Sequence, residues 1–136
     1  MRIEGGCHCG FITYEADIPA EEAVICHCTD CQTLTGTAFR TTVATTRGGF
    51  RLLSGAPTIY VKTAESGNAR EQAFCPRCGT PIYAAAPGDG PKAYGVRVGS
   101  VRQRGRLVPL MQIWSRSAQT WVNDLAAIPR IETEPA

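Results

Sequence analysis

The chain lacks long hydrophobic runs and carries little net charge. No stretch approaches the ~18 consecutive apolar residues that a membrane-spanning helix needs, so we expect no membrane partner. The first six residues have no apolar segment of the kind found in secretory signal peptides, and we therefore expect a cytoplasmic protein. The net charge of +2 is too small to favour a nucleic-acid-binding surface.

Linkers, low-complexity segments and internal repeats are also missing. Nothing in the 136 residues separates a second folding unit, so we expect one domain over residues 1–130 and a polar tail at 131–136. A chain of this length buries only a modest core. Bound metal ions would add stability, because a metal site is complete only in the folded chain.

What the chain does have is cysteine. The seven cysteines fall in three clusters, which are Cys7 and Cys9, then Cys26, Cys28 and Cys31, then Cys75 and Cys78. Disulfides would leave one thiol over, and clustered cysteines in a reducing compartment are typical metal ligands. Four thiolates complete a tetrahedral zinc site, whereas three leave an open position that distinguishes a reactive zinc from a structural one. We therefore predict two Zn²⁺ ions per chain, one structural and one catalytic.

The spacing suggests how the ligands divide. Cys75-Pro76-Arg77-Cys78-Gly79 predicts a zinc knuckle, since proline restricts the turn and glycine tolerates the positive φ that often follows. Cys7 and Cys9 fit as its second pair, because residues i and i+2 of an extended segment face the same side. The remaining three cysteines lie within six residues and are enough to hold a metal from one segment.

Spacing alone leaves alternatives open. Cys75 and Cys78 could instead join two cysteines of the middle cluster. The triplet could also be a closed structural site, completed by His8, His27, Asp30 or an unreactive water. We expect both histidines to be packed or solvent-facing rather than ligating, since each lies between two cysteines and would point to the opposite face of a strand.

The residue pattern is mainly β. β-branched and aromatic runs separated by turn residues predict strands at Phe11–Ala16, Ala38–Thr46, Phe50–Leu53, Thr58–Lys62, Arg70–Phe74, Pro81–Ala85, Tyr94–Gly99 and Leu107–Trp114. Helical turns are expected only after Cys28, through Thr33, and around Ser117–Val122. The predicted architecture is a set of small antiparallel sheets packed around structural zinc.

Arginine outnumbers lysine by 12 to 2, and four arginines lie close together. They are Arg97, Arg102, Arg104 and Arg106. Such a group can capture carboxylates beside an open zinc, but we favour an exposed turn around Gly105 with solvated charges. Trp114 and Trp121 are expected in the core.

The cysteines lie in three longer motifs, which are, in chain order, Gly5-Gly6-Cys7-His8-Cys9-Gly10, Cys26-His27-Cys28-Thr29-Asp30-Cys31-Gln32 and Phe74-Cys75-Pro76-Arg77-Cys78-Gly79-Thr80-Pro81-Ile82-Tyr83. These motifs resemble those of a known family, the glutathione-dependent formaldehyde-activating enzymes and the related centromere-protein-V-type proteins. Gly99-Ser100, Ile113-Trp114 and Trp121-Val122 follow in family order, so the resemblance covers nearly the whole chain. Gln32 stands where many members carry arginine.

The resemblance implies a mainly β, zinc-ribbon-like fold often called a β-tent. It implies a structural zinc on Cys7, Cys9, Cys75 and Cys78, and a catalytic zinc on Cys26, Cys28 and Cys31. The implied reaction joins glutathione and formaldehyde into S-hydroxymethylglutathione, or cleaves that adduct, which makes the protein a carbon–sulfur lyase. The alternative is a non-catalytic zinc protein that binds small thiols or a macromolecular partner.

Overall fold

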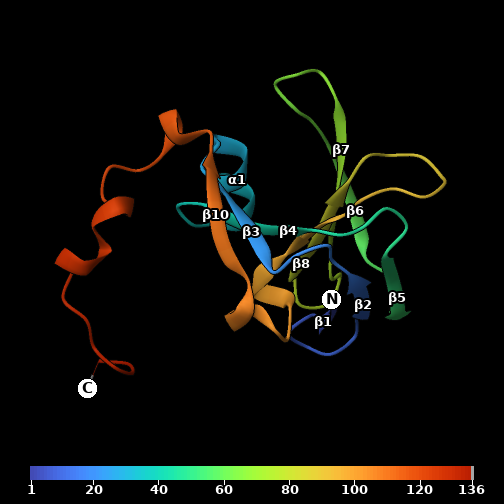
Figure 1. Ribbon diagram of the computed structural model, residues 1–136, viewed down its shortest axis with the longest axis horizontal. Helices are drawn as coiled ribbons and strands as arrows, with labels where there is room; N and C mark the ends of the chain where they lie inside the picture. The colour runs from blue at the N-terminus through green and yellow to red at the C-terminus, as the bar shows by residue number, and fades with distance from the viewer. Residues whose placement is uncertain (136) are drawn as a thin grey trace.

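Ten strands account for most of the regular structure in the computed structural model, which describes residues 1–135. In chain order they are β1 (Arg2–Gly6), β2 (Thr13–Asp17), β3 (Glu22–Cys26), β4 (Arg40–Ala44), β5 (Phe50–Ser54), β6 (Thr58–Thr63), β7 (Ala69–Phe74), β8 (Pro81–Ala85), β9 (Gly95–Arg97) and β10 (Val108–Ile113). A smaller sheet has the order β1-β2-β5, and a larger one has the order β10-β3-β4-β9-β8-β7-β6 (Figure 1). The predicted mainly β class is confirmed. All pairings are antiparallel except that of β10 with β3, which is parallel.

Helices are short. They are α1 (Thr29–Thr35) and four 3₁₀ segments, η1 (Val98–Ser100), η2 (Arg104–Arg106), η3 (Ser115–Ser117) and η4 (Val122–Ala127). Helix α1 begins after Cys28, whose sulfur accepts a hydrogen bond from the backbone N–H of Cys31. It ends at Gly36, where the left-handed φ of 70° closes the helix with an N–H bond to the carbonyl of Gln32. The helix expected after Cys28 is thus confirmed.

Aromatic rings join the two sheets. Phe50 on β5 stacks on Tyr14 of β2, with ring centroids 5.2 Å apart, and on Tyr94 next to β9, at 4.8 Å. Tyr83 of β8 meets the edges of both Phe50 and Tyr94. These contacts cover the inner face of the small sheet, so its alternating residues Tyr14 and Ala16 are buried.

Gly5 shows how closely the sheets approach. It forms an isolated bridge with Val101, and a Cβ on Gly5 would lie 2.3 Å from both the Tyr14 hydroxyl and the Ser100 carbonyl oxygen. The Tyr14 hydroxyl bonds the Ser100 hydroxyl at 2.8 Å. Burial raises the pKa of Tyr14 to about 12. Only glycine fits at this contact, which fixes the strand that leads into Cys7.

Several predicted elements differ in extent. Two strands, β1 and β3, are absent from the prediction, and the strand expected at Tyr94–Gly99 is only three residues long before it turns into η1. The helical turns expected around Ser117–Val122 form at the two ends of that range, as η3 up to Ser117 and η4 from Val122, and not between them. Each of these segments depends on long-range contacts that local composition does not encode.

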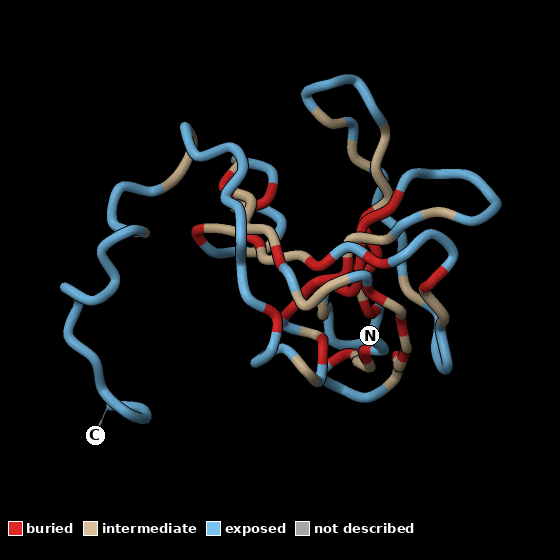
Figure 2. The backbone as a smooth tube through the Cα atoms, in the orientation of Figure 1, coloured by how far each residue is buried: buried red, intermediate tan, exposed pale blue. Residues whose placement is uncertain are grey.

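The segment after β10, residues 115–135, is called the C-terminal arm here. It leaves the sheets and runs beside them, and none of its residues is buried (Figures 1 and 2). The expectation that Trp114 and Trp121 belong to the core is therefore wrong, since they are 39% and 48% exposed. The tail expected at 131–136 is exposed as far as residue 135, and Ala136 lies outside the described residues. No helix within residues 1–135 has the length and apolar character to cross a membrane.

Candidate metal centres

The seven cysteine side chains gather in two separate groups, and all seven are free of disulfides. Cys7, Cys9, Cys75 and Cys78 form the four-sulfur group, and Cys26, Cys28 and Cys31 form the three-sulfur group. In each group all the sulfur atoms lie within 4.8 Å of one another. Either group can therefore bind a metal ion.

The four-sulfur group is built from two similar turns. In the first, the Cys7 N–H donates to the Ile12 carbonyl at 3.0 Å, and Gly10 takes a φ of +83°. In the second, the Cys75 N–H donates to the Thr80 carbonyl at 3.0 Å, and Gly79 takes a φ of +79°. The positive φ after each cysteine pair is the glycine role that the knuckle motif predicts.

Two contacts hold these turns together. The His8 N–H donates to the Thr80 hydroxyl at 3.0 Å. The guanidinium of Arg77 lies 3.8 Å from the ring centroid of Phe11. Contacts between the two turns thus bring the four sulfurs together, although Cys9 and Cys75 are 66 residues apart in the chain.

The sulfur spacing fits a tetrahedral ion. The Sγ atoms of Cys7 and Cys9 are 3.6 Å apart, and those of Cys9 and Cys75 are 3.8 Å apart. A tetrahedron with Zn–S bonds of about 2.3 Å has edges of about 3.8 Å. Backbone N–H groups of Ile12 and Arg77 donate to Cys7 and Cys75 at 3.2 and 3.4 Å, which stabilises thiolates. Hydrogen bonds from Thr80 lower the pKa of Cys78 to about 5.

The three-sulfur group sits where β3 ends and α1 begins. Cys26 is the last residue of β3, Cys28 precedes α1, and Cys31 lies in its first turn. The bond from the Cys31 N–H to the Cys28 sulfur, 3.3 Å long, fixes the turn between them. One short segment therefore supplies three soft sulfur donors, a set suited to zinc.

Within residues 1–135, no histidine, further cysteine or carboxylate lies close enough to these three sulfurs to act as a fourth donor. His27 is buried with its Nε2 bonded to Gln112 at 2.7 Å, and its ring packs on Phe39. His8 is exposed, and the Asp30 carboxylate pairs with Lys62 at 2.9 Å. Both histidines are packed or solvent-facing, as expected. A tetrahedral ion held by the three sulfurs would keep one position for an outside ligand.

Burial and nearby cations act in opposite directions on these thiols. Burial raises the pKa of Cys31 to about 12, while the positive charge of Arg40 opposes that rise. For Cys28, burial also acts upward, but hydrogen bonds from Cys31 and the charge of Lys62 leave its pKa lowered. Positive side chains thus favour the thiolate form that metal binding requires.

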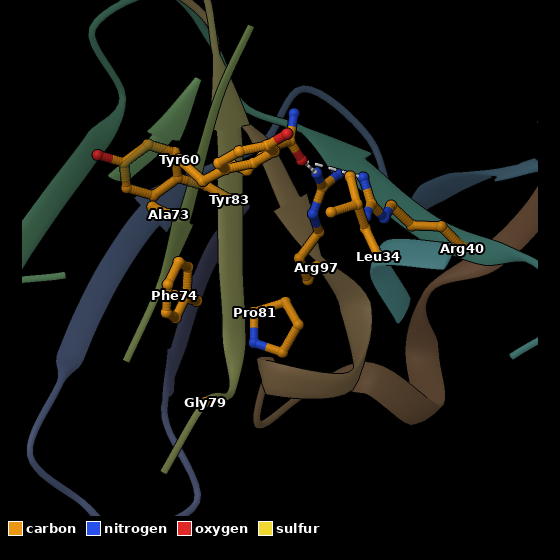
Figure 3. Close-up of a pocket in the computed structure, with 10 residues that line it drawn as sticks. Leu34, Arg40, Tyr60, Ala73, Phe74, Gly79, Pro81, Tyr83 and Arg97 are labelled. Carbon is orange, nitrogen blue, oxygen red and sulfur yellow. Dashed lines mark hydrogen bonds between the residues drawn. The ribbon is translucent and has the colours of Figure 1, made fainter. Parts of the chain in front are cut away.

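None of the three cysteines lines the cavity of about 390 Å³ shown in Figure 3, but its wall includes residues of helix α1 and strand β4, which flank the three-sulfur group. Leu34, one helical turn beyond Cys31, forms part of its wall. Arg40 and Arg97 also line it, and Figure 3 shows their guanidinium groups converging with dashed hydrogen bonds. Both bonds end on the Gln72 amide oxygen, at 3.2 Å from Arg40 and 2.7 Å from Arg97.

The arginine group predicted from the sequence is divided in the structure. Arg102 and Arg106 are exposed and pair with Glu4 and Glu21, as a solvated turn predicts. Arg97 is different, because it is only 9% exposed and lines the cavity. The sequence analysis missed Arg40, whose only signal was a charge inside a β-branched strand.

Gln32 has a clear structural role at the position where many resembling proteins carry arginine. Its amide nitrogen donates to the carbonyls of His27 and Ser117, at 2.8 and 3.0 Å. Its amide oxygen accepts from Gln119 at 2.7 Å. Gln32 therefore ties the C-terminal arm to the helix that carries Cys31.

Comparisons with known proteins agree with this architecture. A crystal structure of a Rhodobacter sphaeroides protein is similar, with a TM-score of 0.58 over 78% of this chain and 97% of that one. At 21% identity this likeness supports the fold alone. The sequence model of the family described as glutathione-dependent formaldehyde-activating enzyme matches residues 2–117, which include all seven cysteines. The chain therefore belongs to the glutathione-dependent formaldehyde-activating enzyme family.

Proposed function

We propose that this protein is a zinc-dependent carbon–sulfur lyase that forms or cleaves an S-hydroxymethyl adduct of glutathione or a related small thiol. Family membership associates the chain with glutathione and formaldehyde. The observation that carries the proposal is the three-sulfur group, to which residues 1–135 add no fourth protein donor, together with a cavity lined by two arginines, one of which acts on Cys31 through its charge. Cys26, Cys28 and Cys31 would hold the catalytic Zn²⁺.

The four-sulfur group would hold a structural Zn²⁺. Its donors complete a tetrahedral shell by themselves, and their spacing of 3.6 and 3.8 Å matches that shell. The proposed role of this zinc is structural: it would hold together the C-terminal ends of β1 and β7, which lead into Cys7 and Cys75. We extend the same proposal to one domain over residues 1–130 and to a cytoplasmic, thiol-reducing location.

In the proposed reaction the thiolate sulfur attacks the carbonyl carbon of formaldehyde, a C–S bond forms, and the oxygen takes up a proton. The reverse direction breaks the same bond and releases the thiol and the aldehyde. A Zn²⁺ ion at the three-sulfur group would favour the deprotonated form of the entering thiol. The protein contributes positive charge from Arg40 and Lys62, which act on Cys31 and Cys28 respectively. The cavity wall restricts the approach of the two reactants, which lowers the entropic part of the barrier.

The test compares the exchange rate of the glutathione–formaldehyde adduct with and without the protein, because this adduct also forms unaided. We expect acceleration that is lost in Cys28→Ser, while that variant keeps its circular dichroism spectrum and its second metal ion. Acceleration that persists in Cys28→Ser would refute the assigned site. If thiols bind but adduct exchange is accelerated for none of them, the lyase proposal is refuted and the protein is a thiol-binding protein.

A further inference from the structure

Two buried arginines share a neutral partner. Arg40 and Arg97 are 7% and 9% exposed, and both donate to the Gln72 amide oxygen. Arg97 also donates to the Thr42 hydroxyl at 3.1 Å. Neither guanidinium takes part in an ion pair among the described residues. Burying a charge is costly unless an opposite charge or several hydrogen bonds compensate it, so this pair lacks an anion.

An anion has space to bind beside these arginines. Both line the 390 Å³ cavity, and both also line a second cavity of about 420 Å³. Among residues 1–135 the buried Nε atom of Arg40 has no hydrogen-bond partner, so the charge of this side chain is poorly compensated. Two neighbouring guanidinium groups are an arrangement that binds a planar carboxylate through paired hydrogen bonds. Burial and the neighbouring charge of Arg40 lower the pKa of Arg97 to about 9, and the charges of Cys31 and Cys26 offset only part of that shift.

The cysteine thiolates are the nearest competing source of negative charge. Arg40 on β4 lies directly opposite Cys26 of β3 in the strand register. Its guanidinium, however, bonds Gln72 on β7, which lies beyond β9 and β8 in the sheet order. The charged end of Arg40 thus reaches the cavity and bonds Gln72 rather than a cysteine, although the charges of both arginines still interact with the three-sulfur group.

We propose that Arg40 and Arg97 bind a carboxylate of the thiol substrate, and so select thiols that carry a carboxylate some distance from the sulfur. This inference rests on the proposed function, since it places the substrate sulfur at the three-sulfur group. The separation it requires is on the order of 5–10 Å, because Arg40 on β4 and Arg97 on β9 start one and two strand spacings from Cys26 on β3. Gln72 positions both guanidinium groups for this contact.

The experiment measures binding by calorimetry on the metal-loaded protein, with no turnover required. The ligands are mercaptopropionate, mercaptohexanoate and mercaptoundecanoate, each compared with the thiol alcohol of the same length. We expect mercaptohexanoate to bind about tenfold to hundredfold more tightly than mercaptohexanol. The preference for the acid should be smaller at both ends of the series. Equal affinities for acid and alcohol at every length would overturn the inference.

Two variants and one control locate the effect. Arg97→Gln should lose the preference for the acid and leave the affinity for the alcohol unchanged. Gln72→Glu replaces the amide group by a carboxylate of the same shape, which can pair with both arginines. This variant should lose the preference for the acid over the alcohol and should melt at a higher temperature. The matched control is Arg102→Gln, which removes a charge that is paired with Glu4 on the surface and should leave the preference intact.

The outcomes separate this inference from the lyase proposal. If Arg97→Gln fails to fold, Gln72→Glu still decides, and an unchanged preference in that variant would refute the carboxylate site. Loss of one metal ion from either variant would assign the arginines to the metal centre and overturn the inference. If the adduct exchange is accelerated equally for acid and alcohol, the lyase function stands without the carboxylate site. Selective binding of the acid without any acceleration of adduct exchange would support the carboxylate site and refute the lyase proposal.

Discussion

Removing one sulfur from each group should have unequal effects on stability. Cys9 and Cys28 are suitable for comparison, because neither thiol is buried and a Cys→Ser change alters little packing. When the loss of one sulfur releases the ion, the four-sulfur group loses a cross-link that spans 66 residues from Cys9 to Cys75, whereas the three-sulfur group loses one that spans about five residues. In the loop-closure model these cross-links contribute roughly 4 and 2 kcal/mol to the free energy of unfolding.

We therefore expect Cys9→Ser to lose about 2 kcal/mol more stability than Cys28→Ser. For a chain of this size the losses correspond to melting temperatures lower by roughly 10–20 °C and 5–10 °C. Thermal unfolding would be followed by far-ultraviolet circular dichroism under reducing conditions, with bound metal measured on the same samples. Equal destabilisation, or a larger loss of stability in Cys28→Ser, would refute the proposal that the four-sulfur group stabilises the fold more than the three-sulfur group does.

Three further predictions concern other parts of the chain. Arg51→Gln should lower the melting temperature at pH 7, because hydrogen bonds from Arg51 and Arg2 hold the pKa values of Glu15 and Asp17 below their usual range. That stability is present above the unfolded pKa of about 4 and is lost as the pH falls through the folded values, so melting curves of variant and wild type should converge in acid. Gly5→Ala should lower the free energy of unfolding in urea by about 1–3 kcal/mol or more, since its Cβ would lie 2.3 Å from a backbone oxygen. A chelator should remove one metal ion without unfolding and the second only with loss of β circular dichroism; simultaneous loss would contradict this order.

The cysteine groups are the part of the site that the sequence predicts best. Ligand spacing within a cluster is set by local turns, and local turns are encoded by nearby residues such as Pro76 and Gly79. The approach of Cys7 to Cys75 is not local, yet the number of donors a metal requires restricts the pairing. The mainly β class likewise follows from β-branched runs that are visible in the sequence.

What the sequence does not reveal depends on distant partners. β1 ends in two glycines, which are poor strand formers, and it is a strand because Gly5 alone fits against Tyr14 and Ser100. Arg97 and the exposed Arg102 both follow a valine, but the strand of Arg97 lies in the middle of the large sheet. Trp114 and Trp121 would suit a core, yet they follow an edge strand that nothing in residues 1–135 covers. In each case the decisive contact joins residues far apart in the chain.

The parallel pairing of β10 with β3 has a consequence for synthesis. A growing chain contains all four donors of the four-sulfur group once Cys78 has been made. Strand β3, which leads into Cys26, keeps one open edge until Ile113 is added, and His27 lacks its Gln112 partner until then. At ribosomal speed this interval lasts about 2–7 s, so the three-sulfur group receives its support from β10 well after the donors of the four-sulfur group have been made.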